Sequence, residues 1–200
     1  LFALNGGWVY PGTPYDAGAI GASNYYNKKD VARAKALLKE AGYNGERFSL
    51  LTDSNISFHN KSAGVIAEQL KAVGINAVIN QVDWPTALKI RLEDKGWNGW
   101  TLTMGIEPYL GPAAITATLA GTRPHFVKAD PVLEGLYKDP TAGETVAARK
   151  ATFAKIQDQL YKYFGIIKLG DTGQMQASRA DIKGFKTFRF PRVYGIWREK

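Results

Sequence analysis

Helix-like and strand-like segments alternate from residue 30 to residue 104, and this alternation restricts the fold more than any other feature of the sequence. Apolar residues at helical spacing predict three helices, and short apolar runs between them predict three strands. Strands that alternate with helices form βαβ units, so we expect an α/β fold with a mixed, partly parallel sheet flanked by helices. The predicted helices cover 31–41, 60–73 and 84–94, and the predicted strands cover 48–52, 75–82 and 100–104.

The ends of these helices carry their own signals. Asp30 is suited to cap the first helix, because its side chain can accept a hydrogen bond from a free backbone N–H. Gly42 and Gly74 follow the first and second helices, where a left-handed residue often ends a helix. Pro85 stands in the first turn of the third helix, where a missing N–H costs nothing.

The rest of the chain is less regular. Residues 1–27 are rich in Gly, Tyr, Pro and Asn and read as an irregular segment. We expect short helices near 112–120 and 130–138, and the longest helix over 144–164. A short strand is predicted at 166–169, followed by extended segments with a partly buried apolar face in the tail.

Composition excludes several classes of protein. The 200 residues include no Cys, so disulfides, thiol catalysis and thiolate metal sites are ruled out. No apolar run of about 18 residues is present that could span a membrane. The formal net charge of +8 permits a nucleic-acid partner, but the basic residues are spread along the chain and are densest only in the tail. A solvated basic face explains them more simply.

Six short fragments along the chain carry a resemblance. They are 30–43 (DVARAKALLKEAGY), 69–75 (QLKAVGI), 83–84 (DW), 96–98 (GWN), 155–157 with 167–170 (KIQ and IKLG), and 182–185 (IKGF). In this order they resemble the peptide/nickel/opine type (family 5) of extracytoplasmic solute-binding proteins of ABC importers. Each fragment alone is a weak signal, and the first is also an ordinary amphipathic helix. Together they extend from about residue 25 to the end of the chain.

The resemblance implies one lobe of a type II periplasmic-binding-protein-like fold. Members of the family have two lobes that close on a ligand, and this chain is similar to their carboxyl-terminal part. We therefore expect 1–27 to be an irregular segment that enters from the missing lobe, and 28–200 to form the carboxyl-terminal lobe. The implied partners are the amino-terminal lobe, ABC permease subunits and a small-molecule or peptide ligand. The implied location is periplasmic, or extracytoplasmic and membrane-tethered in a Gram-positive host.

Ligands of open α/β sheets lie outside the carboxyl ends of the strands, which directs attention to 52–58, 83–84 and 104–109. In the dipeptide-binding branch of the family, an acid near the third of these loops takes the ammonium group of the peptide, and Glu107 is the rough match. Each candidate has a structural alternative: a solvent-facing loop acid, an Asx-turn, or a tryptophan packed between helix and sheet. The candidate ligand-binding residues are Asp53, Asn55, Trp84, Met104, Gly105, Glu107 and Tyr109.

The same branch has an Arg near the first loop that clamps the peptide carboxylate, but 52–58 contains no Arg. The resemblance therefore implies a peptide or peptide-like solute, with an opine, a sugar derivative or a nickel chelate as the alternative. A carboxylate-based hydrolase is a further rival, although no evident catalytic dyad or nucleophile motif is present. The two histidines, His59 and His125, show no ligand-like spacing, so we expect no catalytic residue, no metal site and no cofactor.

Overall fold

A computed structural model of the chain describes residues 2–93, 95–105, 130–137, 145–173, 175–187 and 192–199. It divides into two compact units, Gly6–Lys168 and a smaller unit that joins Leu1–Asn5 to Leu169–Lys200. The predicted boundary after residue 27 falls inside the larger unit, and the assignment of 1–27 to another lobe stays a prediction. In the described residues no helix is both long and apolar enough to cross a membrane.

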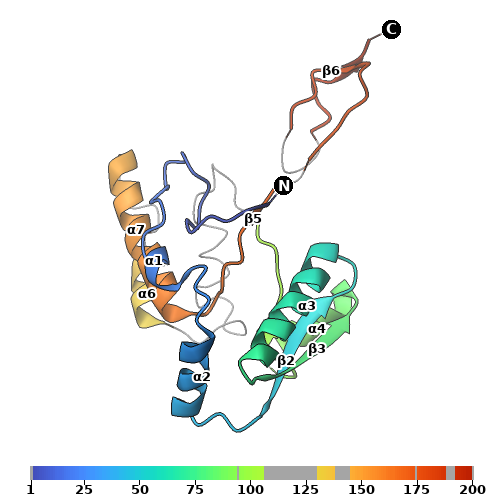
Figure 1. Cartoon of the computed structure of the whole chain (residues 1–200). Coiled ribbons are helices and arrows are strands. Elements are labelled where there is room, and N and C mark those ends of the chain that lie inside the picture. Colours follow the sequence, from blue (N-terminus) through green and yellow to red (C-terminus); the bar gives the residue numbers. More distant parts are fainter. Residues whose placement is uncertain are drawn as a thin grey trace. The chain divides into compact units, whose positions relative to one another are not determined.

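A three-stranded parallel sheet in the order β3-β2-β4 forms the centre of one layered part of the larger unit (Figure 1). Its strands are β2 (Arg47–Asp53), β3 (Asn76–Val82) and β4 (Gly99–Trp100). The helix α3 (Ser57–Ala72) connects β2 to β3, and α4 (Trp84–Leu92) connects β3 to β4. These are the predicted βαβ units, so the predicted α/β class is confirmed, and the antiparallel pairs lie outside this sheet.

Small residues allow α3 to approach the sheet closely. Ala63 and Ala67 of the helix are buried, and they pack with Leu50 of β2 and Ala77 of β3. The strand β2 is the central one, and its five residues from 49 to 53 are all buried. A central parallel strand must be covered on both faces, which explains its almost uninterrupted burial.

The helix α2 (Val31–Glu40) has the ends that the sequence predicts. The side chain of Asp30 accepts a hydrogen bond from the N–H of Arg33 at 2.8 Å. At the other end the N–H of Tyr43 reaches the carbonyl of Leu38, and Gly42 has a φ of 70°, which together form a Schellman motif. No residue of α2 is buried, and of its apolar stripe Ala34 and Leu38 are half-buried.

A second core joins the amino-terminal segment to helices from late in the sequence. It includes α1 (Ala22–Tyr25), α6 (Pro131–Tyr137) and the long α7 (Val146–Tyr163), and the last two confirm predicted helices. Gln157 of α7 is fully buried and binds the segment at three points. Its Oε1 accepts from the N–H of Trp8 at 2.9 Å, and its Nε2 donates to the carbonyls of Gly18 and Ile20, each at 2.9 Å.

The smaller unit contains two antiparallel ladders of two residues per strand. In the first, β1 (Phe2–Ala3) pairs with β5 (Asp171–Thr172), and in the second, β6 (Ile182–Lys183) pairs with β7 (Trp197–Arg198). Asp181 accepts hydrogen bonds from Arg179 and Arg198, so part of the basic tail is paired at the surface.

Three predictions of local structure need correction. The strand predicted at 166–169 is absent: α7 is capped by Phe164 with a φ of 55°, and among the described residues no strand pairs with 166–169. The strand predicted at 100–104 is only Gly99–Trp100, and the last backbone hydrogen bond that the structure shows from this segment to β2 runs from the N–H of Thr101 to the carbonyl of Leu51. The second helix begins at Ser57 and not at residue 60, since the turn after β2 leads directly into it. The helix predicted at 112–120 lies outside the described residues.

Candidate functional site

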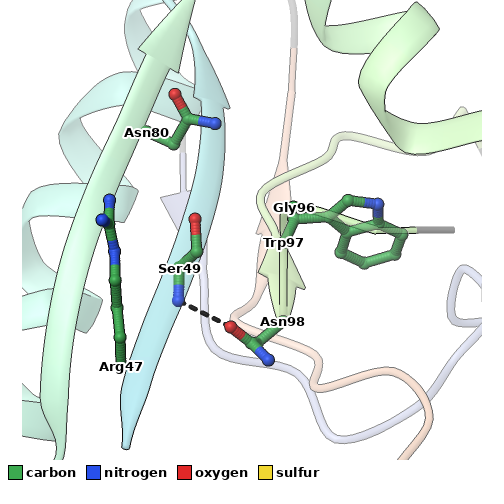
Figure 2. A pocket seen from close by; sticks show the side chains of 6 residues that line it. All are labelled: Arg47, Ser49, Asn80, Gly96, Trp97 and Asn98. Atoms are coloured by element: carbon green, nitrogen blue, oxygen red, sulfur yellow. Dashed lines mark hydrogen bonds between the residues drawn. The ribbon is translucent and has the colours of Figure 1, made fainter. Parts of the chain in front are cut away.

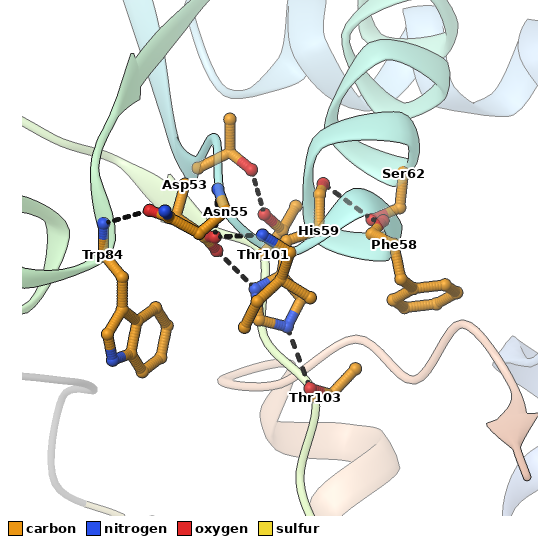
Figure 3. Close-up of polar contacts among 10 residues, drawn as sticks. Asp53, Asn55, Phe58, His59, Ser62, Trp84, Thr101 and Thr103 are labelled. Carbon is orange, nitrogen blue, oxygen red and sulfur yellow. Dashed lines mark hydrogen bonds and ion pairs between the residues drawn. The ribbon is translucent and has the colours of Figure 1, made fainter. Parts of the chain in front are cut away.

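The carboxyl ends of the parallel strands bring the first two predicted loops, and the segment that leads into the third, to one edge of the sheet. Residues 54–56 follow Asp53, the last residue of β2, residues 83–84 follow β3, and residues 101–105, the described start of the third loop, follow β4. Figure 3 shows the polar contacts that connect them. Because these loops are far apart in sequence, only the sheet register places them together.

Asp53 makes the turn from β2 into α3. Its Oδ1 accepts from the backbone N–H groups of Asn55, at 3.0 Å, and Ile56, at 2.7 Å, which is the Asx-turn that the sequence offered as the alternative role. Its Oδ2 lies 2.5 Å from Nδ1 of His59. Burial acts to raise the pKa of Asp53, but these hydrogen bonds hold it below its ordinary value.

Asn55 connects the first loop to the second. Its Oδ1 accepts a hydrogen bond from the backbone N–H of Trp84 at 2.9 Å. Asp83, just before Trp84, caps α4 by accepting from the N–H and the hydroxyl of Thr86, at 3.0 and 2.7 Å. The side chain of Asn55 is therefore held at the sheet edge, and Asn55 is an exposed residue.

Trp84 stands half-buried among aromatic rings. Its ring centroid lies 6.0 Å from that of His59 and 6.2 Å from that of Trp100. The guanidinium of Arg91 lies over the ring of Trp100, 4.5 Å from its centroid. Trp84 thus has the structural packing that the sequence allowed, while part of its surface faces solvent.

The third loop is attached by two hydroxyl groups. Thr101 donates a hydrogen bond to the hydroxyl of Thr52 at 2.8 Å inside the sheet. Thr103, two residues later, places its hydroxyl 2.9 Å from Nε2 of His59. Met104 then packs its half-buried side chain against the second core, and Gly105 is exposed. Glu107 and Tyr109 lie outside the described residues.

His59 is the contributor that the sequence reasoning missed. We considered it only as a metal ligand, for which it has no partner at a suitable spacing. The available signal was its place six residues after Asp53, in the first turn of the helix that follows a buried strand. In the described part of the chain, no group of three or more His, Cys, Asp or Glu side chains could hold a metal ion.

A pocket of about 430 Å³ lies away from these loops (Figure 2). It opens beside the amino-terminal half of β2 and the turn before β4, where Asn98 accepts a hydrogen bond from the N–H of Ser49 at 2.8 Å. None of the predicted ligand-binding residues lines it. The lining residues are Arg47, Ser49, Asn80, Gly96, Trp97 and Asn98.

Comparisons with known proteins agree with this architecture. The family model "Bacterial extracellular solute-binding proteins, family 5 Middle" matches residues 4–124. A probable peptide ABC transporter periplasmic-binding protein of Sinorhizobium fredii is 31% identical over 74 residues, which cover 34% of this chain and 14% of that protein.

Two solved structures share the fold. The dipeptide-binding protein of Pseudoalteromonas sp. SM9913, in complex with Met-Leu, has a TM-score of 0.76 at 18% identity and covers 100% of this chain and 40% of its own. The protein AgaA of A. tumefaciens R10, in complex with agropinic acid, has a TM-score of 0.64 at 21% identity. The match covers 82% of this chain and 34% of AgaA. The predicted type II binding-protein fold is thereby confirmed.

The chain spans 14% of the curated relative and 34 to 40% of these two solved structures. The matched family and the named relatives are binding proteins, in agreement with the prediction that the chain is not an enzyme.

Proposed function

This chain belongs to family 5 of the bacterial extracellular solute-binding proteins, and from that membership we propose that it forms one wall of a cleft that captures a peptide or peptide-like solute. The complete protein would close a second, amino-terminal lobe over the solute and deliver it to the permease of an ABC importer. This role places it in the periplasm, or outside the membrane of a Gram-positive host. Binding is non-covalent.

The observation that carries the proposal is the meeting of three loops at the carboxyl edge of the parallel sheet. Ligands of open α/β sheets bind at this edge. Asn55, an exposed residue, supplies a hydrogen-bonding side chain there, and the half-buried Trp84 supplies a flat apolar ring. Binding pockets for small solutes combine apolar walls with a few placed polar groups, and these two side chains provide one of each.

Glu107 and Tyr109 belong to the same proposal as the continuation of the third loop. A carboxylate there would pair with the ammonium group of a peptide. Met104 and Gly105 lead into that loop, and Asp53 shapes the turn that presents Asn55. In this proposal Asp53 does not contact the solute itself but positions Asn55, which does.

An opine or another modified solute is the second candidate. The first loop, 52–58, has no Arg to clamp a peptide carboxylate. AgaA, which shares the fold, is seen with agropinic acid, so the fold also accommodates a solute that is not a plain peptide. Sugar derivatives and nickel chelates belong in the same screen.

The test is a thermal-shift and calorimetric screen of the full-length protein. The panel contains peptides of two to five residues, agropinic acid, sugar derivatives and a nickel chelate. A solute present at 100 times its Kd should stabilise the protein by about 2.7 kcal/mol. The proposal fails if no solute of the panel shifts the melting temperature.

Matched asparagine variants then locate the site. Asn55→Ala should weaken binding by about 5- to 50-fold, which corresponds to loss of one or two polar contacts. Asn80→Ala, in the separate pocket that none of the predicted ligand-binding residues lines, should leave the affinity unchanged. If Asn80→Ala weakens binding and Asn55→Ala does not, the ligand binds in that pocket and not at the sheet edge.

A further inference from the structure

His59 is 1% exposed and Asp53 is fully buried, yet the proposed function assigns the histidine no task. We propose that His59 is a positioning residue of the solute site: Asp53 orients its imidazole ring, and the ring anchors Thr103 at the start of the third loop. The proposal rests on the proposed function, because anchoring this loop matters for binding only if the loop contacts a solute.

Asp53 fixes the orientation and the tautomer of the ring. An ionised carboxylate only accepts hydrogen bonds, so the Nδ1 atom 2.5 Å from Oδ2 must carry a proton. The two backbone N–H groups on Oδ1 keep the carboxylate itself from rotating. With its proton on Nδ1, a neutral imidazole presents the lone pair of Nε2 on its opposite edge.

Thr103 occupies the position that this lone pair faces. Its hydroxyl lies 2.9 Å from Nε2, and Figure 3 shows the ring between Asp53 and Thr103. A hydroxyl can donate to a neutral Nε2 and accept from a protonated one, so the contact persists in either state of the ring. The contact joins α3 to the segment that leaves β4, just before Met104 and Gly105.

Asp53 and Thr103, the two partners of the imidazole ring, differ in exposure, and this difference distinguishes a positioning role from simple stabilisation. The pair formed by His59 and Asp53 is buried and supports the fold whether or not Thr103 is present. Thr103 is exposed, so water could satisfy Nε2 in place of its hydroxyl. The contact with Thr103 therefore adds little to global stability, and its main effect is to hold the local position of the loop.

The order carboxylate, imidazole, hydroxyl is also the order of a hydrolase triad. In such a triad the hydroxyl attacks the substrate, whereas here it belongs to the segment that is being held. The family consists of binding proteins, which favours the positioning role. Catalysis remains an outcome that the experiment can detect.

The first measurement needs no ligand. In the full-length protein, Thr103→Val keeps the shape of the side chain and removes the hydroxyl. Amide hydrogen exchange of Thr101, whose N–H donates to the carbonyl of Leu51 at 3.2 Å, should then become about two- to twelve-fold faster, the equivalent of one net hydrogen bond. Ser62→Ala is the control, because its hydroxyl donates to the carbonyls of Phe58 and His59 without reaching Thr103. Unchanged exchange in Thr103→Val would overturn the anchor.

Two conservative variants separate the two edges of the ring. His59→Asn keeps an amide near the place of Nδ1 and its contact with Asp53, but it does not reach Thr103. His59→Gln places its amide near the place of Nε2 and can restore the contact with Thr103. His59→Asn should therefore behave like Thr103→Val in the exchange of the Thr101 amide, and His59→Gln should restore part of the protection.

A double variant makes the coupling measurable. Adding Thr103→Val to His59→Asn should produce no further increase in exchange, because the contact has already been lost. Full additivity would show that the two residues act independently and would overturn the proposal. In the wild type, the Nδ1 proton should give a strongly downfield NMR resonance that disappears in Asp53→Asn.

Binding of Met-Leu and of agropinic acid, measured by calorimetry, completes the test. For a probe that binds, Thr103→Val should raise the Kd by about two- to twelve-fold while Ser62→Ala leaves it unchanged. Equal affinity of Thr103→Val and wild type would overturn the positioning role, as would cleavage of the probe that depends on Thr103. If neither probe nor any other solute of the panel binds the wild type, the proposed function fails, and the exchange data alone still decide whether His59 anchors the loop.

Discussion

Replacing Gln157 by leucine should loosen the amino-terminal segment from α7. Leucine has a similar volume and similar helix propensity, so the change removes mainly the polar contacts. The N–H of Trp8, a residue that is 4% exposed, would lose its acceptor. A buried donor left without a partner costs about 1–3 kcal/mol.

The other two contacts contribute less. The carbonyls of Gly18 and Ile20 belong to exposed residues, so water can replace the amide of Gln157, and each loses only about 0.5–1.5 kcal/mol. The better burial of leucine offsets part of this sum, about 1–2 kcal/mol. We therefore expect a net loss of about 2–3 kcal/mol in the free energy of unfolding.

The assay combines urea unfolding of the full-length protein with amide exchange at Trp8. A loss of 2–3 kcal/mol corresponds to exchange that is about 30- to 140-fold faster. Lys155→Leu is the matched control, because it introduces leucine at an exposed position of the same helix and should change stability by less than about 0.5 kcal/mol. Unchanged exchange at Trp8 in Gln157→Leu would refute the reasoning.

Two further predictions concern the larger unit. Gly12→Ala and Gly21→Ala both place a side chain at positive φ, 81° and 77°, which costs about 1–2 kcal/mol each. Of these two positions, only Gly21 would bring the new Cβ to 3.0 Å from the backbone of Asp158. Thermal unfolding should therefore show that Gly21→Ala loses about 1–3 kcal/mol more stability than Gly12→Ala. Equal losses would argue against the close packing of α1 on α7. The second prediction concerns acid. Burial acts to raise the pKa of Asp53, but the hydrogen bonds that it accepts act in the opposite direction and outweigh burial. The bond with His59 has the largest effect among them, and the pKa of Asp53 in the folded protein is therefore lowered. The stability from this group is therefore complete above the unfolded pKa of about 3.9 and is lost as the pH falls through the folded pKa. Asp53→Asn should flatten this part of the stability profile in urea unfolding at several pH values, and a profile that is as steep as in the wild type would contradict the assignment.

Residues with local signals were predicted well. Asp30, Gly42, Gly74 and Pro85 mark helix ends because a cap depends on backbone groups within three or four residues of it. The strand predicted at 166–169 failed for the opposite reason, since a strand needs a neighbour that local sequence does not specify. Of the candidate site residues, Asp53, Asn55 and Trp84 are brought to one edge of the sheet, while their contact with a solute stays a prediction.

By itself, the sequence determined the βαβ order, the ends of the helices and, through six ordered fragments, the family. The tertiary structure decided what His59 and Gln157 do. Both were visible in the sequence, one as a lone histidine and the other as part of a family fragment. Their roles depend on partners 44 residues away at Thr103 and 149 residues away at Trp8. Periodicity and capping report only on near neighbours along the chain, so contacts at this separation exist only once the sheet register and the packing of α7 are set.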